Sequence, residues 1–406
     1  MNLVFFDDVH SEHLLPLTYT RPACELRVGM MSIKEKWEID LGTPSSYQTF
    51  RPYLSVRYPS TLSNHNLFIN GACIPDELAL QHVQTLANGY FVSQSGRVIM
   101  CKTDREILPT TPESLRAIGL IEINETDQFR MISYPEDLFV KNAEEISADL
   151  NRKKRNQDFI KASTSNKMSA VEHIFLEEGA QVEHAYLNAS TGPIYLSAGS
   201  VVMEGAMIRG PFYLGPHSEV KMGSKIYGAT SIGPHCKVGG EITNSILFGH
   251  SNKGHEGFMG QAIIGQWCNW GADTNNSNLK NNYEMVKLWD EHLGRFRQTD
   301  LQFAGLVMGD HAKTGINTML NTGTVIGVGA NIFGAGYPRN FLPSFCWGGA
   351  QGLETFRFDK FSQTAARVME RRKLAFDGAE EVIMKAVFEE TSAQRTWEKK
   401  LLTTQI

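Results

Sequence analysis

The sequence predicts an α/β domain, then a parallel β-helix, then C-terminal helices. The main observation is a six-residue period of aliphatic side chains in the middle of the chain, with glycines in the intervals. The period runs through Leu196, Val202, Ile208, Leu214, Val220, Ile226, Ile232 and Val238. It matches neither the 3.6-residue period of a helix nor the two-residue period of a strand. It is typical of hexapeptide β-helices, in which each short strand has one inward side chain before a tight turn.

The pattern before this period is mixed. Residues 1–150 predict the α/β domain: a buried strand at 3–6, a helix over 28–37, a strand at 67–69, a hairpin over 91–100 and an exit helix over 134–150. Residues 151–170 are polar, basic and without periodicity, so we expect a linker. Its Arg152–Arg155 run is interpreted as a solvated helix end rather than a nucleic-acid signal.

The β-helix is predicted over residues 171–350, with interruptions. The six-residue phase stops at Val238, restarts through Ile246, Phe258, Ile264 and Trp270, and returns at Met308, Leu320, Ile326 and Ile332. The polar segment 278–300 is expected to loop out, because insertions in repeat proteins collect on one face. Residues 351–406 carry helical spacing, and we expect these helices to cap the open end of the coil.

Composition favours a globular protein without a membrane span. The 406 residues are 42% hydrophobic and 20% charged, with a formal net charge of −5, which gives no reason to expect nucleic acid as a partner. The six cysteines form no CxxC pair and are expected to be reduced. The first residues, MNLVFFDDVH, lack the basic start and long apolar run of a signal peptide. We therefore expect a cytoplasmic protein.

The densest polar cluster of the repeat region spans residues 251–257 and is followed by 269–272 and 275–278. It contains His255, and an imidazole can accept a proton from an attacking amine or hydroxyl. The asparagines that follow can donate and accept hydrogen bonds, as sugar hydroxyls and acetamido groups require. The alternative is structural: asparagines stacked along turns, with His255 on the surface.

The run SNKGHEGFMGQAIIGQWCNWGADTNNSNLKNNY resembles the acetyltransferase signature of the bifunctional N-acetylglucosamine-1-phosphate uridylyltransferase/glucosamine-1-phosphate acetyltransferase family. The resemblance implies a left-handed β-helix that forms homotrimers and takes acetyl-CoA and a sugar phosphate. It places His255 on the general base, Asn269 at the acetyl-transfer site and Asn278 at a substrate-binding position. Lys253 and Phe258 are further candidates for substrate binding.

This sequence departs from the family pattern at several positions. Phe258 stands where the family has Tyr, and Asp273 where a Gly is usual. The basic residues that hold the sugar phosphate have no clear counterpart in residues 239–245. Several lysines could substitute for them or be plain surface charge: Lys221, Lys225, Lys237 and Lys253.

The first domain resembles a divergent, shortened sugar-nucleotidyltransferase domain of Rossmann type, through LPLTYTRP (15–22), ELRVG (25–29) and YPEDL (134–138). The resemblance implies a nucleotide such as UTP or dTTP. Arg21, Arg27 and Lys34 could neutralise its phosphates, and Asp7 or Asp8 could hold Mg²⁺. The glycine-rich phosphate loop is missing, however, and DDVHS (7–11) stands in its place. The carboxylates and arginines could equally be structural.

Two other functions remain open. Some hexapeptide trimers bind zinc through three histidines and hydrate carbon dioxide. The histidines available for such a site are His217, His235, His250, His255 and His311, at irregular spacing. The other alternative is a non-catalytic trimeric scaffold or a sugar-nucleotide sensor.

Overall fold

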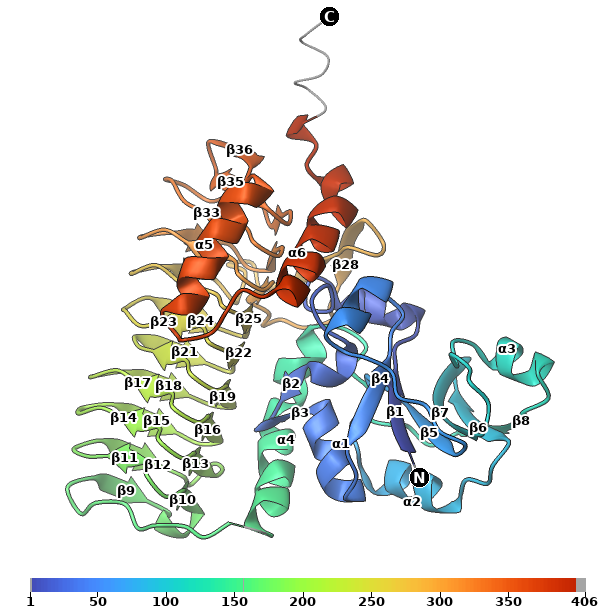
Figure 1. Ribbon diagram of the computed structural model, residues 1–406. Helices are drawn as coiled ribbons and strands as arrows, with labels where there is room; N and C mark the ends of the chain where they lie inside the picture. The colour runs from blue at the N-terminus through green and yellow to red at the C-terminus, as the bar shows by residue number, and fades with distance from the viewer. Residues whose placement is uncertain (1, 156, 399–406) are drawn as a thin grey trace, which may run out of the picture. The chain divides into compact units, whose positions relative to one another are not determined.

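The computed structural model describes residues 2–155 and 157–398 (Figure 1). The chain divides into two compact units, residues 1–26 with 31–135 and residues 27–30 with 136–406. Each unit is described by itself. Within the described residues, no helix is both long and apolar enough to cross a membrane.

The first unit is built on a mixed sheet with strand order β4-β1-β5-β7-β6-β8. Its strands are β1 (Asn2–Phe6), β4 (Ser45–Gln48), β5 (Asn66–Asn70), β6 (Tyr90–Gln94), β7 (Arg97–Thr103) and β8 (Ile121–Asn124). β1 is parallel to both β4 and β5, whereas β7 is antiparallel to β5 and β6. The alternate residues Val4 and Phe6 of β1 pack with Phe68 and Phe91 in a buried cluster. The predicted buried first strand is confirmed.

The helices of this unit are α1 (Ile33–Leu41), α2 (Glu77–Thr85) and α3 (Pro112–Ala117). The helix predicted over 28–37 was placed too early. Two short strands, β2 (Arg27–Val28) and β3 (Met31–Ser32), precede it. α1 begins after Ser32, whose hydroxyl and the Glu35 carboxylate form a capping box. That cap is the start signal that the apolar spacing alone did not reveal.

The second unit is a parallel β-helix, as predicted. Its first face contains β10 (Ile174–Leu176), β13 (Ile194–Leu196), β16 (Phe212–Leu214), β19 (Thr230–Ile232), β22 (Ile246–Gly249), β25 (Ala262–Gln266), β29 (Leu306–Met308), β32 (Thr324–Ile326) and β34 (Phe341–Leu342). The second contains β11 (Gln181–Val182), β14 (Val201–Val202), β17 (Glu219–Val220), β20 (Lys237–Val238) and β23 (Asn252–Lys253), and resumes in β30 (Lys313–Thr314), β33 (Asn331–Ile332), β35 (Cys346–Gly349) and β36 (Gly352–Thr355). The third contains β9 (Lys167–Ser169), β12 (Tyr186–Asn188), β15 (Met207–Arg209), β18 (Lys225–Tyr227), β21 (Glu241–Thr243) and β24 (Phe258–Gly260), followed by β26 (Asn275–Asn276) and β31 (Met319–Leu320).

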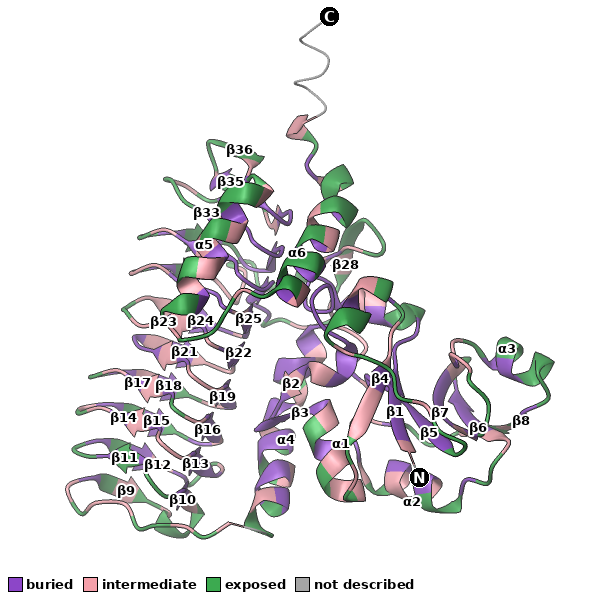
Figure 2. Ribbon diagram, viewed as in Figure 1, coloured by how far each residue is buried: buried purple, intermediate pink, exposed green. Residues whose placement is uncertain are grey.

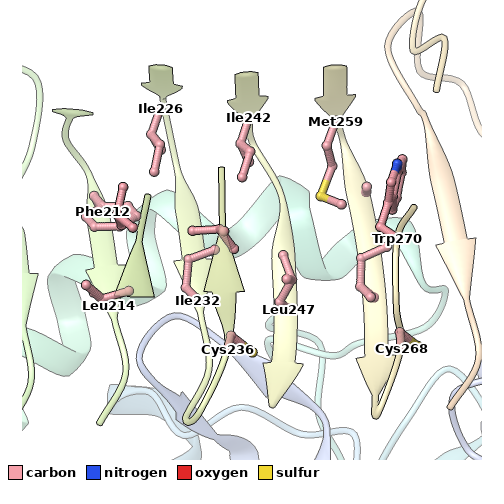
Figure 3. Packing of buried hydrophobic residues seen from close by; sticks show 14 of the residues in the cluster. Phe212, Leu214, Ile226, Ile232, Cys236, Ile242, Leu247, Met259, Cys268 and Trp270 are labelled. Atoms are coloured by element: carbon pink, nitrogen blue, oxygen red, sulfur yellow. The ribbon is translucent and has the colours of Figure 1, made fainter. Parts of the chain in front are cut away.

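The six-residue period becomes three columns of inward side chains. Leu214 lies in register with Leu196 on the first face, Val220 with Val202 on the second and Ile226 with Ile208 on the third. These side chains belong to the buried core of the coil. Figure 2 colours the strands by burial, and Figure 3 shows Leu214 and Ile226 within this core. On the second face one inward aliphatic side chain per strand is enough here, because its neighbours in the column cover it above and below, whereas several strands of the first face add a second, such as Phe212 beside Leu214.

Past Val238 the predicted inward positions are partly wrong. Ile232 pairs with Leu247 rather than Ile246, and Ile242 pairs with Met259 rather than Phe258. Leu247 and Met259 are the members of the buried cluster (Figure 3). One coil is shorter here, and a shift of one residue along a strand turns each side chain to the opposite face.

The segment 278–300 leaves the coil, and part of it forms an antiparallel hairpin of β27 (Lys287–Asp290) and β28 (Arg295–Gln298). The guanidinium of Arg297 donates to Glu136 at 2.6 Å, which ties the hairpin to the start of α4 (Glu136–Lys154). α4 lies against the first face, where the buried Asn142 donates to Ala229 O at 2.7 Å. The Arg297–Glu136 contact therefore holds the inserted hairpin to α4.

The C-terminal helices are α5 (Phe358–Glu370) and α6 (Gly378–Glu390). They lie along a flank of the coils, so the expectation that they cap the open end was wrong (Figure 1). α5 buries Phe361, whose ring meets His311 and Phe345 edge-on at 5.6 and 4.9 Å. Strands β35 and β36 close the last coil instead as an antiparallel pair.

Candidate functional site

Strand β23 carries a lysine where the β-helix places an apolar side chain. Lys253 is in register with the inward Val238 and is only 1% exposed. Its ammonium donates to Gly239 O and to His255 O, both at 2.8 Å. Burial lowers the pKa of this ammonium to about 8. The side chain thus holds the turn after β23 to the preceding coil.

That turn contains His255, whose side chain is exposed. The backbone of the turn is closely fitted: Gly257 has φ +114°, and a Cβ there would come within 2.2 Å of Thr274 O. The carboxylate of Glu256, between His255 and Gly257, lies 3.8 Å from the ammonium of Lys225. The fold therefore presents this imidazole to solvent from a backbone fixed on both sides.

Asn269 lies on the same face as β23. Its backbone forms parallel bridges with Asn252 and with Lys313, and its side chain is exposed. Because Lys237 is in register with Asn252, the outward side chains form one row. We call Lys237, Asn252, Asn269 and Lys313 the polar column.

Other candidates from the sequence have internal partners on the third face. Phe258 N–H donates to Asn275 Oδ1 at 2.7 Å, and Asn276 exchanges two hydrogen bonds with the backbone of Gly260. Asn278 Nδ2 donates to Gln261 Oε1 at 2.5 Å. The structural interpretation of the asparagines is therefore supported at Asn275 and Asn276. Asn278 and Phe258 are only half-buried and stay candidates for substrate contact.

In the first unit, Asp7 and Asp8 follow β1 and are both buried. Asp7 accepts from the Tyr47 hydroxyl at 2.6 Å and from Ala23 N–H at 3.2 Å. Burial raises the pKa of Asp7 to about 6, against the opposing effect of these hydrogen bonds. Asp8 pairs with Arg97 at 2.6 Å. Donors surround both carboxylates where Mg²⁺ would need further oxygen ligands, so this arrangement does not fit a magnesium site.

Each of the basic residues assigned to the nucleotide has a partner within the protein. Arg21 is buried, with Nη2 3.4 Å from the Thr20 hydroxyl that accepts from it. Lys34 forms an ion pair with Glu25 at 3.1 Å. Arg27 belongs to the other unit, where its guanidinium donates to Met30 O. Among these three only Arg21 and Lys34 share a unit.

Three of the histidines considered for zinc form a ladder instead. His217, His235 and His250 stack at one corner with ring centroids 5.1 and 4.9 Å apart, and Trp267 continues the stack at 4.2 Å. All four have φ between +53° and +62°, as residues of one repeated turn. In the part of the chain that the structure describes, no group of three or more His, Cys, Asp or Glu residues could hold a metal ion. The zinc hypothesis gains no support here.

Sequence reasoning missed Arg372, just beyond α5. Its Nη2 donates to Asn252 Oδ1 at 3.0 Å, across 120 residues of sequence. No local motif marks such a contact. It brings a guanidinium to the polar column.

Comparison with known proteins agrees with the resemblance. Residues 3–158 match the family described as sugar nucleotidyl transferase. The chain is 28% identical over 136 residues to the bifunctional protein GlmU of Methanocaldococcus jannaschii, which covers 34% of this chain and 28% of that protein. It is 34% identical over 95 residues to GlmU of Methanococcus vannielii, covering 22% of each chain. The matches thus span about a quarter of the length of these relatives, and over these regions the predicted resemblance is confirmed.

Two solved structures are also similar. The polySia-specific acetyltransferase NeuO is 14% identical with a TM-score of 0.27, over 52% of this chain and 94% of that one. The UDP-N-acetylglucosamine acyltransferase of Arabidopsis is 14% identical with a TM-score of 0.27, over 57% and 92%.

Proposed function

We propose that this protein is an acetyl-CoA-dependent N-acetyltransferase that acts on an amino-sugar phosphate or a related sugar. The observation that carries the proposal is the exposed His255 on a turn held by the buried Lys253 ammonium. Sequence similarity to GlmU proteins supports it. A purely structural turn would need no ammonium inside the coil, where burial penalises its charge.

In the proposed reaction His255 is the general base. The imidazole accepts a proton as the sugar amine attacks the thioester carbonyl of acetyl-CoA, and a C–N bond forms. The C–S bond then breaks, and the proton passes from the imidazolium to the departing thiolate. Asn269 is proposed to contact the acetyl-transfer site, and Asn278 and Phe258 the sugar.

The test is acetyl transfer by His255→Ala, with His184→Ala as the matched control. His184 is another exposed histidine of the coil. We expect His255→Ala to lose roughly 10²–10⁴-fold in kcat, the range of general bases, and His184→Ala to retain activity. Equal turnover by the two variants would remove His255 from the mechanism. A scaffold or sensor would bind ligand and show no turnover to lose.

For the first unit we propose little or no nucleotidyl transfer. Its similarity to sugar nucleotidyl transferases is clear, but the carboxylates that would hold Mg²⁺ have protein partners. The measurement is pyrophosphate release from UTP or dTTP in the presence of sugar phosphates. Rapid release would show that these side chains rearrange around the nucleotide.

We also propose a homotrimer. The third face exposes a strip of large apolar side chains, Tyr186, Met207 and Tyr227, each at least 45% exposed. Large apolar side chains exposed together on one face are typical of an interface. A second and third copy of the chain would cover it.

A further inference from the structure

The end of α5 is fixed against the β-helix. The buried residues Phe361, Ala365 and Met369 lie on one side of this helix. After its last residue the chain turns at once, with Arg372 N–H donating to Met369 O at 2.8 Å. The position of Arg372 is therefore set by packing one helix turn away.

The guanidinium of Arg372 reaches the polar column at Asn252, with Nη2 donating to Oδ1 at 3.0 Å. Asn252 directly precedes Lys253 and pairs through its backbone with Asn269. The guanidinium thus stands on the strand that leads into the His255 turn. Two residues proposed for acetyl transfer are close to Asn252. His255 follows it by three positions in the sequence, and Asn269 is its neighbour on the adjacent coil.

The charge of Arg372 is not balanced by a carboxylate. Within residues 2–155 and 157–398, Asn252 is its only side-chain partner. The nearby ladder histidines carry no compensating charge: burial first, then the neighbouring His235, then Arg372 lower the pKa of His250 to about 4. Lys237 on the same column is paired with Glu219 at 2.8 Å. A half-buried arginine without an anionic partner is suited to bind an anion from outside.

We propose that Arg372 is a specificity-determining residue that binds a phosphate group of a substrate at the polar column. The inference rests on the proposed acetyl transfer and would supply the cation that residues 239–245 lack. A guanidinium presents several N–H donors in a planar fork that matches phosphate oxygens, and the Asn252 contact occupies only part of it. The phosphate belongs either to the amino sugar or to coenzyme A.

The test compares Arg372→Ala and Arg372→Lys with the control Arg371→Ala, which removes the exposed neighbouring arginine. Calorimetric titration with coenzyme A and with glucosamine 1-phosphate measures binding without turnover. We expect Arg372→Ala to weaken one of these ligands by about 10-fold or more, as for a lost charge-assisted hydrogen bond, and Arg371→Ala to change neither by more than about twofold. Arg372→Lys should fall between them, because it keeps the charge and loses the fork.

The ligand affected identifies the source of the phosphate. Weaker coenzyme A binding assigns Arg372 to the acyl donor, and weaker sugar-phosphate binding, with unphosphorylated glucosamine unaffected, assigns it to the acceptor. Unchanged affinities in Arg372→Ala, no binding of either ligand by the native protein, or a lowered melting temperature as the sole effect would each overturn the inference. If the native protein binds through Arg372 but transfers no acetyl group, the proposed function fails and the anion site stands. If Arg372→Ala transfers acetyl groups as well as the native protein does, the proposed function stands and the anion site fails.

Discussion

The buried ammonium of Lys253 makes the stability of this protein depend on pH in a predictable direction. Its pKa is about 8 in the folded protein and 10.5 as an ordinary lysine. Below pH 8 both states are protonated, and the folded state bears the full cost of the buried charge. Between pH 8 and 10.5 the folded state releases its proton first, so stability rises with pH.

The size of the effect follows from the two pKa values. Linkage gives a gain of about 1.4 kcal/mol by pH 9 and about 2 kcal/mol by pH 9.5, relative to neutral pH. The variant Lys253→Met retains most of the apolar stem between Val238 and Trp270 and has no proton to release. We therefore expect the free energy of unfolding of this variant to lack the rise. Other lysines titrate in both proteins, and their effects cancel in the difference.

Urea unfolding at pH 7.5, 8.5 and 9.5, followed by circular dichroism, measures that difference. Over this range the free energy of unfolding of the native protein should rise steadily relative to that of Lys253→Met. Parallel pH profiles would show that the ammonium is not buried as described and would refute the reasoning. Activity of the same variant at pH 7.5 should fall, because the carbonyl of His255 loses the donor that fixes its turn.

Three further predictions concern the rest of the chain. Gly271→Ala should destabilise the coil strongly, because its Cβ would lie 2.3 Å from Gly315 O, whereas Gly254→Ala on the same face meets nothing within 4 Å; urea unfolding of the pair measures the difference. In the native protein, stability should fall as the pH rises from 4 to 6, because the raised pKa means that the folded state binds the Asp7 proton more tightly than the unfolded state. Asp7→Asn should abolish this fall, and thermal melts at pH 4, 5 and 6.5 measure it. Light scattering should give a trimer, and Tyr227→Glu on the exposed strip should shift it towards monomer, whereas an unchanged mass would exclude that face as the interface.

The β-helix could be predicted because it requires an aliphatic residue at regularly spaced single positions. Each strand needs an aliphatic residue at its inward position. Leu196, Leu214 and Ile232 therefore indicate the coil from the sequence alone. The prediction lost its register where a coil shortened. Nothing between Val238 and Leu247 marks the change, because both Ile246 and Leu247 are aliphatic and both are buried.

The histidine ladder shows how coil length hides a regular feature. His217, His235, His250 and Trp267 are separated by 18, 15 and 17 residues, which looks irregular along the sequence. In the fold each residue is one coil beyond the last at the same corner. Variation in turn length therefore removed the sequence period without removing the stack.

The candidate site divides in the same way. His255 could be predicted because it lies in a continuous run of sequence that resembles a known signature. Arg372 could not, because its contact with Asn252 depends on where α5 ends against the coil. Contacts between segments so far apart carry no periodic signal, and only the packing of both segments reveals them.

The position of Lys253 bears on the choice between enzyme and scaffold. A β-helix that only supports other parts would be more stable with an aliphatic residue in register with Val238, as in the coils before it. The ammonium instead reaches one carbonyl of the neighbouring coil and one in the turn of His255. These two contacts thus join the turn that a general base needs fixed to the neighbouring coil. This coincidence of an energetic cost with a fixed, exposed imidazole favours catalysis at His255 over a scaffold role.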